Sequence, residues 1–227
     1  MKEAKRLVLL GLLLIVGMSG CLKNGTPEPQ LYAGVAIYHS SPDAPDLTII
    51  IDNAVINTAP FKYKNYSNYI EVLVGDRRMR FNSFSDGTNL VDATLNFEVN
   101  KSYTLFVVNK LSSIELLKIS DATDFPSSGN GKVRCLQLSP DAPQVEVKWT
   151  GDSKSLFSGM TFKQVEDFRE VPSGKYSLEV KVIGGSGRTI VVPDVEIKEA
   201  GYYTILIEGF DNPSVFINGL TVRVIAN

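Results

Sequence analysis

The chain is poor in the residues that most often carry out chemistry. Its 227 residues include one histidine, His39, and two cysteines, Cys21 and Cys135. The sequence contains no CxxC pair, no HExxH segment, no glycine-rich phosphate loop and no dinucleotide-binding fingerprint. These absences exclude the common motifs of zinc enzymes, dithiol redox proteins and nucleotide-dependent enzymes. We therefore expect no cofactor and no enzymatic activity.

Basic charge is also scarce. Lys and Arg number 23 against 25 Asp and Glu, which gives a formal net charge of −2 at pH 7. No basic run or patch appears along the chain, and such a patch is the electrostatic footprint of a nucleic-acid-binding protein. We therefore expect no nucleic-acid partner.

Long apolar runs are missing except near the N-terminus. There, Lys2, Lys5 and Arg6 precede a segment, residues 7–16, that is apolar apart from one glycine. This run is too short to span a bilayer and has the length of a signal-peptide hydrophobic region. The following Met-Ser-Gly-Cys, which ends at Cys21, resembles the lipobox of bacterial lipoproteins. An ordinary secretory signal with an incidental cysteine is the alternative.

The lipobox resemblance implies a processing and anchoring scheme. Residues 1–20 would be removed as a signal peptide, and the membrane partner would be reached through acylated Cys21. The proline-containing segment 21–30 would act as a tether. Residue 22 is Leu rather than Asp, so the inner-membrane retention signal of some lipoproteins is missing. We therefore expect an outer membrane lipoprotein, on either the cell-surface or the periplasmic face.

A five-residue string, Ser-Pro-Asp-Ala-Pro, occurs twice, 98 positions apart. Self-similarity at a fixed offset indicates that a structural unit has been duplicated. The two copies consist of Ser41, Pro42, Asp43, Ala44 and Pro45, and of Ser139, Pro140, Asp141, Ala142 and Pro143.

The similarity extends over most of the chain. Later segments match at nearly the same offset, so that Gly75 corresponds to Gly174. The sequence predicts a first β-sandwich repeat over 31–125, a linker over 126–130 and a second repeat over 131–227. Because the linker is rich in Pro, Ser and Gly, we expect an exposed boundary and two repeats that each fold alone.

Short segments rich in β-branched and aromatic residues, separated by turn residues, predict strands nearly throughout. About seven strands in under a hundred residues predict an all-β fold of two tandem immunoglobulin-like antiparallel β-sandwich domains. The predicted strands are 35–38, 47–51, 69–74, 78–84, 96–99, 103–109 and 114–119 in the first repeat, and 176–182, 195–198 and 203–207 in the second.

The repeated string and its surroundings resemble a known family. His39-Ser-Ser-Pro-Asp-Ala-Pro, followed by an apolar alternating strand, is similar to the opening motif of the bacterial domain-of-unknown-function 4397 family. The segments around Gly75 and Gly174 are similar to the middle of that family. The resemblance implies a β-rich, secreted or lipid-anchored protein and provides no catalytic or binding residues. The second repeat departs from the motif by having Gln137 in place of His39.

Proline chemistry explains the repeated string without a ligand. Both prolines fix φ and favour an extended residue before them, and the aspartate between them can accept backbone N–H bonds two residues on. We therefore predict a structural corner that leads into the next strand. The alternative is a calcium site built from Asp43, Asp46 and Asp52. Since Asp46 and Asp52 become Gln144 and Thr150 in the second copy, that cluster is not repeated.

Two residue types remain as candidates for chemistry. His39 and Ser40 are adjacent, and neighbouring residues on a strand point to opposite faces, so we do not expect them to form a catalytic pair. Cys135 corresponds to Ile37 of the first repeat, which predicts a small buried hydrophobic residue rather than a reactive thiol.

The first repeat carries three tyrosines, Tyr63, Tyr66 and Tyr69, that are a possible contact surface for sugar rings. Their counterparts, Phe162, Val165 and Phe168, are apolar in all three positions, which favours core packing instead. The leading hypothesis is a non-enzymatic envelope protein for interaction, adhesion or assembly, whose protein or glycan partner is not identified by the sequence. The alternatives are a carbohydrate-binding accessory lipoprotein and an envelope hydrolase with an unrecognised site.

Overall fold

The structure is a computed structural model that describes residues 29–121, 124–212 and 218–226. Residues Leu31–Asn227 form one compact unit. Its described residues contain β-strands and one 3₁₀ turn but no α-helix.

The first-repeat elements are β1 (Tyr32–His39), β2 (Leu47–Ile51), β3 (Ala54–Val55), β4 (Ile70–Leu73), β5 (Gly75–Ser83), β6 (Asn89–Phe97), β7 (Ser102–Val108), η2 (Leu111–Ser113) and β8 (Glu115–Ser120). The second-repeat strands are β9 (Asn130–Gln137), β10 (Gln144–Trp149), β11 (Phe157–Met160), β12 (Val165–Pro172), β13 (Gly174–Ile183), β14 (Thr189–Ile197), β15 (Tyr202–Glu208) and β16 (Thr221–Ala226).

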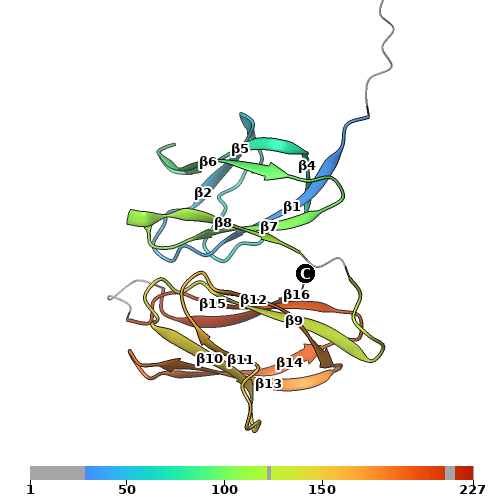
Figure 1. The fold of residues 1–227 in the computed structure, drawn as a ribbon. Helices are drawn as coiled ribbons and strands as arrows, with labels where there is room; N and C mark the ends of the chain where they lie inside the picture. The colour runs from blue at the N-terminus through green and yellow to red at the C-terminus, as the bar shows by residue number, and fades with distance from the viewer. Residues whose placement is uncertain (1–28, 122–123, 213–217, 227) are drawn as a thin grey trace, which may run out of the picture. The chain divides into compact units, whose positions relative to one another are not determined.

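The two sets of eight strands have the same topology. The first set forms sheets of order β4-β1-β7-β8 and β3-β2-β5-β6, and the second forms β12-β9-β15-β16 and β11-β10-β13-β14. Within each set the two sheets lie face to face (Figure 1). Neighbouring strands are antiparallel except for β1 with β7 and β9 with β15, which are parallel. The predicted all-β architecture of two β-sandwiches is confirmed.

Each sandwich encloses its own apolar core, because alternate residues of every strand face the opposite sheet. Val35 and Ile37 of β1 contribute to the first core. Cys135 of β9 contributes to the second, where its side chain is fully buried. The prediction that Cys135 is a small buried hydrophobic residue is confirmed.

Several strands differ from their predicted ranges. The strand predicted over 96–99 is instead β6, which ends at Phe97, and Val99 lies in an exposed turn that continues into Asn100 with a φ of 58°. The strand predicted over 195–198 is β14, which begins at Thr189. Both are edge strands of their sheets. Solvent-exposed polar residues interrupt the apolar pattern of β6, whereas Pro193 and a register shift interrupt that of β14.

A third apolar core joins the two repeats. It lies between the sheet of β1 and β7 and the sheet of β9 and β15, which face each other in Figure 1. The central strands are therefore buried on both faces. The sequence did not predict this core. The fully buried residues of this core are Tyr38, Phe106, Val108, Leu136, Leu138 and Leu206.

Buried polar contacts accompany this core. Arg134 of the second repeat donates to Asp121 of the first at 2.6 Å, with side-chain exposures of 2% and 7%. Glu208 accepts hydrogen bonds from the Tyr38 hydroxyl at 2.9 Å and the Ser40 hydroxyl at 3.1 Å. Burial raises the pKa of the Glu208 carboxyl. These contacts fix the two sheets against each other.

Some contacts between the repeats are reciprocal. Lys64 donates to Thr221 on β16 at 2.8 Å, and Lys163, at the same repeat position, donates to Glu115 on β8 at 3.0 Å. Both lysines have left-handed backbone conformations, with φ of 68° and 65°. Contacts of this kind are typical of two-fold interfaces between identical subunits. The duplicated units therefore meet through equivalent surfaces.

Candidate functional site

The repeated corner string is tied to a distant loop in both copies. Asp43 accepts a hydrogen bond from the backbone N–H of Leu111 at 2.7 Å, and Asp141 accepts one from the N–H of Asp211 at 2.7 Å. Each aspartate thus connects its corner to the segment that follows β7 in the first repeat or β15 in the second. The predicted local turn bond is wrong, because the residue two positions on is Pro45 or Pro143, which has no N–H, and each aspartate bonds to this distant loop instead.

The histidine and glutamine that precede the two corners each contact a backbone carbonyl of their own corner. His39 Nε2 lies 3.2 Å from the carbonyl oxygen of Pro45, and Gln137 Nε2 donates to the carbonyl of Ala142 at 3.3 Å. Both side chains are fully buried. A nitrogen donor at this position bonds to the corner in both repeats, although the acceptor is Pro45 in the first and Ala142, the counterpart of Ala44, in the second.

Replacing His39 by Gln should reduce the acid sensitivity of the fold. Burial lowers the pKa of His39 to about 4, although the Pro45 carbonyl and Asp46 oppose the shift. As the pH falls from 6.5 towards 4, His39 takes up a proton in the unfolded chain but stays neutral in the folded chain. The free energy of unfolding therefore falls. The pKa difference corresponds to about 3 kcal/mol.

His39→Gln retains a donor for the corner, as Gln137 does in the second repeat, and does not titrate in this range, so it should lack this loss. Urea unfolding of both proteins at pH 7.5 and pH 4.5 measures the difference, and the other titrating groups cancel in the comparison. Equal losses in the two proteins would contradict the assignment to His39.

The polar residues singled out by the sequence do not form a reactive constellation. Ser40 donates to Glu208, whereas His39 contacts its own corner, so the adjacent pair points in different directions as predicted. Asp43 bonds to the backbone, and Asp52 accepts from Arg77 at 3.0 Å. Among the described residues, no group of three or more His, Cys, Asp or Glu side chains is arranged to hold a metal ion.

The three tyrosines do not present a common aromatic surface. Tyr66 packs against the core between the repeats, with its ring centroid 6.2 Å from that of Tyr38. Tyr63 is half-buried beside His39, and burial raises its pKa. Tyr69 is 41% exposed, and its hydroxyl donates to Asp121 at 2.7 Å. All three are therefore engaged at or near the contact between the repeats.

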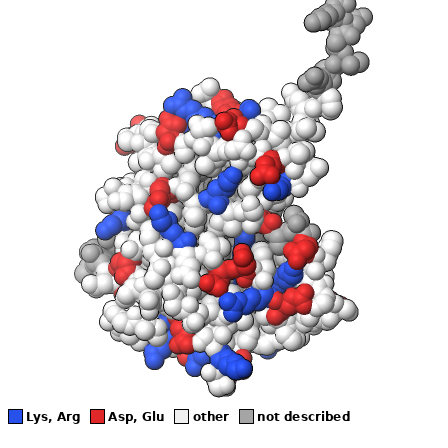
Figure 2. Space-filling view, viewed as in Figure 1, with Lys and Arg blue, Asp and Glu red and all other residues white. Residues whose placement is uncertain are grey.

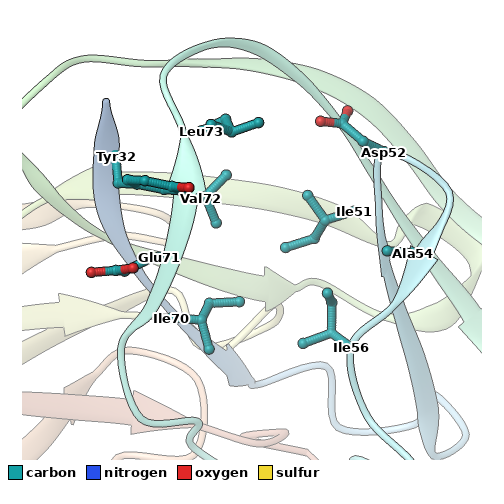
Figure 3. Close-up of a pocket in the computed structure, with 9 residues that line it drawn as sticks. All are labelled: Tyr32, Ile51, Asp52, Ala54, Ile56, Ile70, Glu71, Val72 and Leu73. Atoms are coloured by element: carbon teal, nitrogen blue, oxygen red, sulfur yellow. The ribbon is translucent and has the colours of Figure 1, made fainter. Parts of the chain in front are cut away.

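An apolar groove opens at one edge of the first sandwich, between β3 and β4. Its volume is about 290 Å³. Figure 3 shows Ile51, Ile56, Ile70 and Val72 directed into it. The remaining lining residues are Tyr32, Asp52, Ala54, Glu71 and Leu73. The sequence analysis did not identify this groove.

Exposed apolar side chains gather around the groove. Tyr32, Ile56 and Leu73 line it and are 39%, 40% and 36% exposed. Their sequence neighbours Leu31 and Val55 are 50% and 62% exposed. Contiguous exposed apolar surface of this kind marks interaction sites in soluble proteins.

The second repeat fills the corresponding space with its own side chains. Ile56 and Leu156 make the same backbone bond, to Ile49 at 2.8 Å and to Val147 at 2.7 Å, so the residues that follow them, Asn57 and Phe157, are equivalent. Phe157 is 1% exposed and fills the core edge.

Asn57 instead bonds to the backbone of β2, donating to Leu47 at 2.9 Å and accepting from Ile49 at 2.6 Å. Its side chain is therefore held at β2, and Asn57 is not among the residues that line the groove. A comparison of the two repeats at this position is the sequence signal that identifies the groove.

An arginine completes the closure in the second repeat. Arg169 corresponds to Ile70, and its guanidinium lies 4.7 Å from the centroid of the Phe157 ring. It also donates to the Leu156 carbonyl at 2.5 Å, which connects β12 to the segment around β11. Trp149, the counterpart of Ile51, stacks on Tyr176 nearby, with centroids 4.6 Å apart. The groove is thus open in one repeat and closed in its duplicate.

The remaining surface carries mixed charge. Figure 2 shows acidic and basic side chains interspersed on the face that it displays. The part of the chain that the structure describes contains no helix long and apolar enough to cross a membrane. Cys21 lies outside the described residues.

Comparison with known proteins places the chain in a family. No curated protein matches the sequence. Among solved structures, the chain is similar to CBMbc, a family CBM26 module from Eubacterium rectale Amy13K in complex with maltoheptaose, with 12% identity and a TM-score of 0.27. The match covers 86% of this chain and 97% of that chain. The profile of the family described as "Domain of unknown function (DUF4397)" matches residues 33–148, half of the sequence, from the second residue of β1 through β9 and into β10. The chain therefore belongs to the DUF4397 family.

Proposed function

We propose that this protein is a non-enzymatic interaction module of the cell envelope, which binds a partner through the groove of its first repeat. The observation that carries the proposal is the difference between the two repeats. The same fold closes this edge with Phe157 and Arg169 in one copy and leaves it open in the other. A duplicated fold that retains an apolar opening on one side only favours a binding role for that side.

The chemistry of the groove supports a partner with apolar groups. Removal of apolar surface from water contributes about 25 cal/mol per Å², and the net affinity is what remains after the cost of association. The side chains that point into the groove are aliphatic, and Asp52 at its rim is already bonded to Arg77. A sugar ring needs partners for its hydroxyls, and the four aliphatic side chains directed into the groove supply none. The carbohydrate-binding alternative through Tyr63, Tyr66 and Tyr69 has no support from their positions.

Closing the groove should abolish binding. The double variant Asn57→Phe, Ile70→Arg copies the residues of the second repeat into the first. Site-specific photo-crosslinking in cells from position 56 should give a discrete adduct in the otherwise native protein and none in the double variant. Position 191, where Val191 is 52% exposed in the second repeat, is the matched control position. The same adduct from position 191, or no adduct from position 56, would contradict the proposal.

The proposed anchor is a lipid on Cys21. The charged start, the short apolar run and the small residues before Cys21 support it. Leu22, in place of the Asp of the inner-membrane retention signal, favours an outer membrane location. Acyl chains bind membranes by about 0.8 kcal/mol per buried methylene, so two or three chains hold a protein firmly.

Cys21→Ala should leave the protein unprocessed or release it from the detergent phase in fractionation. Cys135→Ala is the control, because Cys135 is buried in the second core and should not affect partitioning. If Cys21→Ala is acylated and fractionates like the wild type, the anchor is assigned to the wrong residue.

A further inference from the structure

We infer that the groove of the first repeat takes an extended peptide strand, which inserts an aromatic side chain and places a neighbouring Arg or Lys beside Glu71. This inference rests on the proposed function and specifies the chemistry of the partner. It is carried by three features of the described residues: what fills the duplicate of the groove, the free edge of β4, and the charge on that edge.

The second repeat shows which groups complete this site. There, an aromatic ring, Phe157, fills the edge of the core, and the guanidinium of Arg169 covers it. A cation over an aromatic face is a favourable pair. The first repeat has Asn57 and Ile70 at these positions and so lacks both groups. An incoming side chain that resembles Phe157 would restore the packing that the duplicate already has.

The open edge of β4 provides backbone groups for a strand. β4 pairs with β1 and is the terminal strand of its sheet, and no described strand pairs with its other side. Unpaired strand edges bind extended peptides through main-chain hydrogen bonds, and alternate side chains then enter pockets. Because β4 directs Ile70 and Val72 into the groove (Figure 3), an added strand would direct every second residue to the same side.

The intervening residues of the added strand would face the other side, where Glu71 lies. Figure 3 shows its carboxylate directed away from the groove, next to Tyr32. Among the described residues, Glu71 forms no ion pair, whereas Asp52 is paired with Arg77. Opposite charges on neighbouring strands attract, and like charges repel. A basic residue next to the aromatic one is therefore favoured, and an acidic one is disfavoured.

The size of the groove matches one inserted side chain rather than a large ligand. Its volume of about 290 Å³ lies at the lower limit of pockets for drug-sized molecules. Most of the affinity would therefore come from one aromatic anchor and the strand pairing around it, in the way that a few anchors dominate interfaces.

The test is fluorescence anisotropy with the mature chain and a labelled nine-residue peptide in which Phe alternates with Arg. We expect saturable binding, and a loss of about tenfold or more in affinity for the Asn57→Phe, Ile70→Arg double variant. Glu71→Gln should weaken binding and reduce its dependence on salt. Glu170→Gln, which alters the counterpart in the second repeat, should leave the affinity unchanged. Circular dichroism and thermal melts of each variant confirm that the fold is retained.

Three further probes separate the inference from the proposed function. A peptide with Phe alternating with Glu and a Phe/Arg peptide N-methylated at alternate residues should both bind at least tenfold more weakly, because each removes one predicted interaction. Laurate reports on the groove alone. If laurate binds and is excluded by the double variant, but the Phe/Arg peptide does not bind, the strand inference is wrong and the groove remains a binding site. If neither binds and position 56 gives no adduct, both are wrong.

Discussion

Asp121→Ala should lower the free energy of unfolding by about 3–5 kcal/mol, the range for removing one partner of a buried ion pair. The side chains of Asp121 and Arg134 are 7% and 2% exposed, and they meet across the contact between the repeats at 2.6 Å. The carboxylate also accepts hydrogen bonds from Tyr69 at 2.7 Å and Thr104 at 3.0 Å. Its loss leaves a buried guanidinium without its counter-charge and two hydroxyls without their acceptor.

The matched control is Lys163→Ala, which breaks another ion pair between the repeats. Lys163 and Glu115 are 41% and 38% exposed, so water already screens their attraction. This variant should cost less than about 1 kcal/mol. Urea unfolding followed by circular dichroism measures both values. If the two variants lose equal stability, the buried pair does not hold the repeats together in the way the geometry indicates.

The architecture of each repeat was accessible from the sequence because it rests on local patterns. The duplicated Ser-Pro-Asp-Ala-Pro string marks the same corner twice, and the alternating residues of 47–51 and 176–182 lie on strands whose inner faces form the cores. The equivalence of Cys135 and Ile37 also follows from the alignment of the repeats. Local propensity and duplication together determine these features.

The contact between the repeats was missed although the sequence contains a signal for it. The segments 105–108 and 205–207 are apolar at consecutive positions, which is typical of strands buried on both faces. A sandwich with one solvated side would alternate instead. What the sequence does not contain is the partner of each polar residue on this surface, because Arg134 and Asp121 meet only when two separate sheets pack.

The sequence did not predict the groove, for a different physical reason. It arises from a missing side chain, since Asn57 turns back to bond with Leu47 and Ile49 where Phe157 enters the core. Nothing in the local pattern around Asn57 specifies that choice. The same holds for Asp43, whose acceptor role depends on Leu111 of a loop 68 residues away. The orientation of Asn57 and the acceptor role of Asp43 both depend on how separate segments pack in the folded chain.

When residues 31–126 and 130–227 are produced as separate chains, we expect them to associate with each other and to be poorly stable alone. Each half retains a complete pair of sheets, because no described strand crosses from one repeat to the other. Separation nevertheless exposes the third core, including Tyr38 and Phe106 on one half and Leu136 and Leu206 on the other. Exposed apolar patches of this kind drive association.

The partner of each half should be the other half rather than a second copy of itself. Self-association through the same surface would bury Asp121 twice in one homodimer, or Arg134 and Glu208 twice in the other, without the groups that satisfy them in the intact chain. An unpaired buried charge costs several kcal/mol, so these charges select the heterodimer. Sedimentation of each half and of their equimolar mixture should therefore show a 1:1 complex that melts cooperatively and above either half. Two monomers that melt independently and do not bind each other would show that the third core is dispensable, and the repeats would then be separate domains on a common tether.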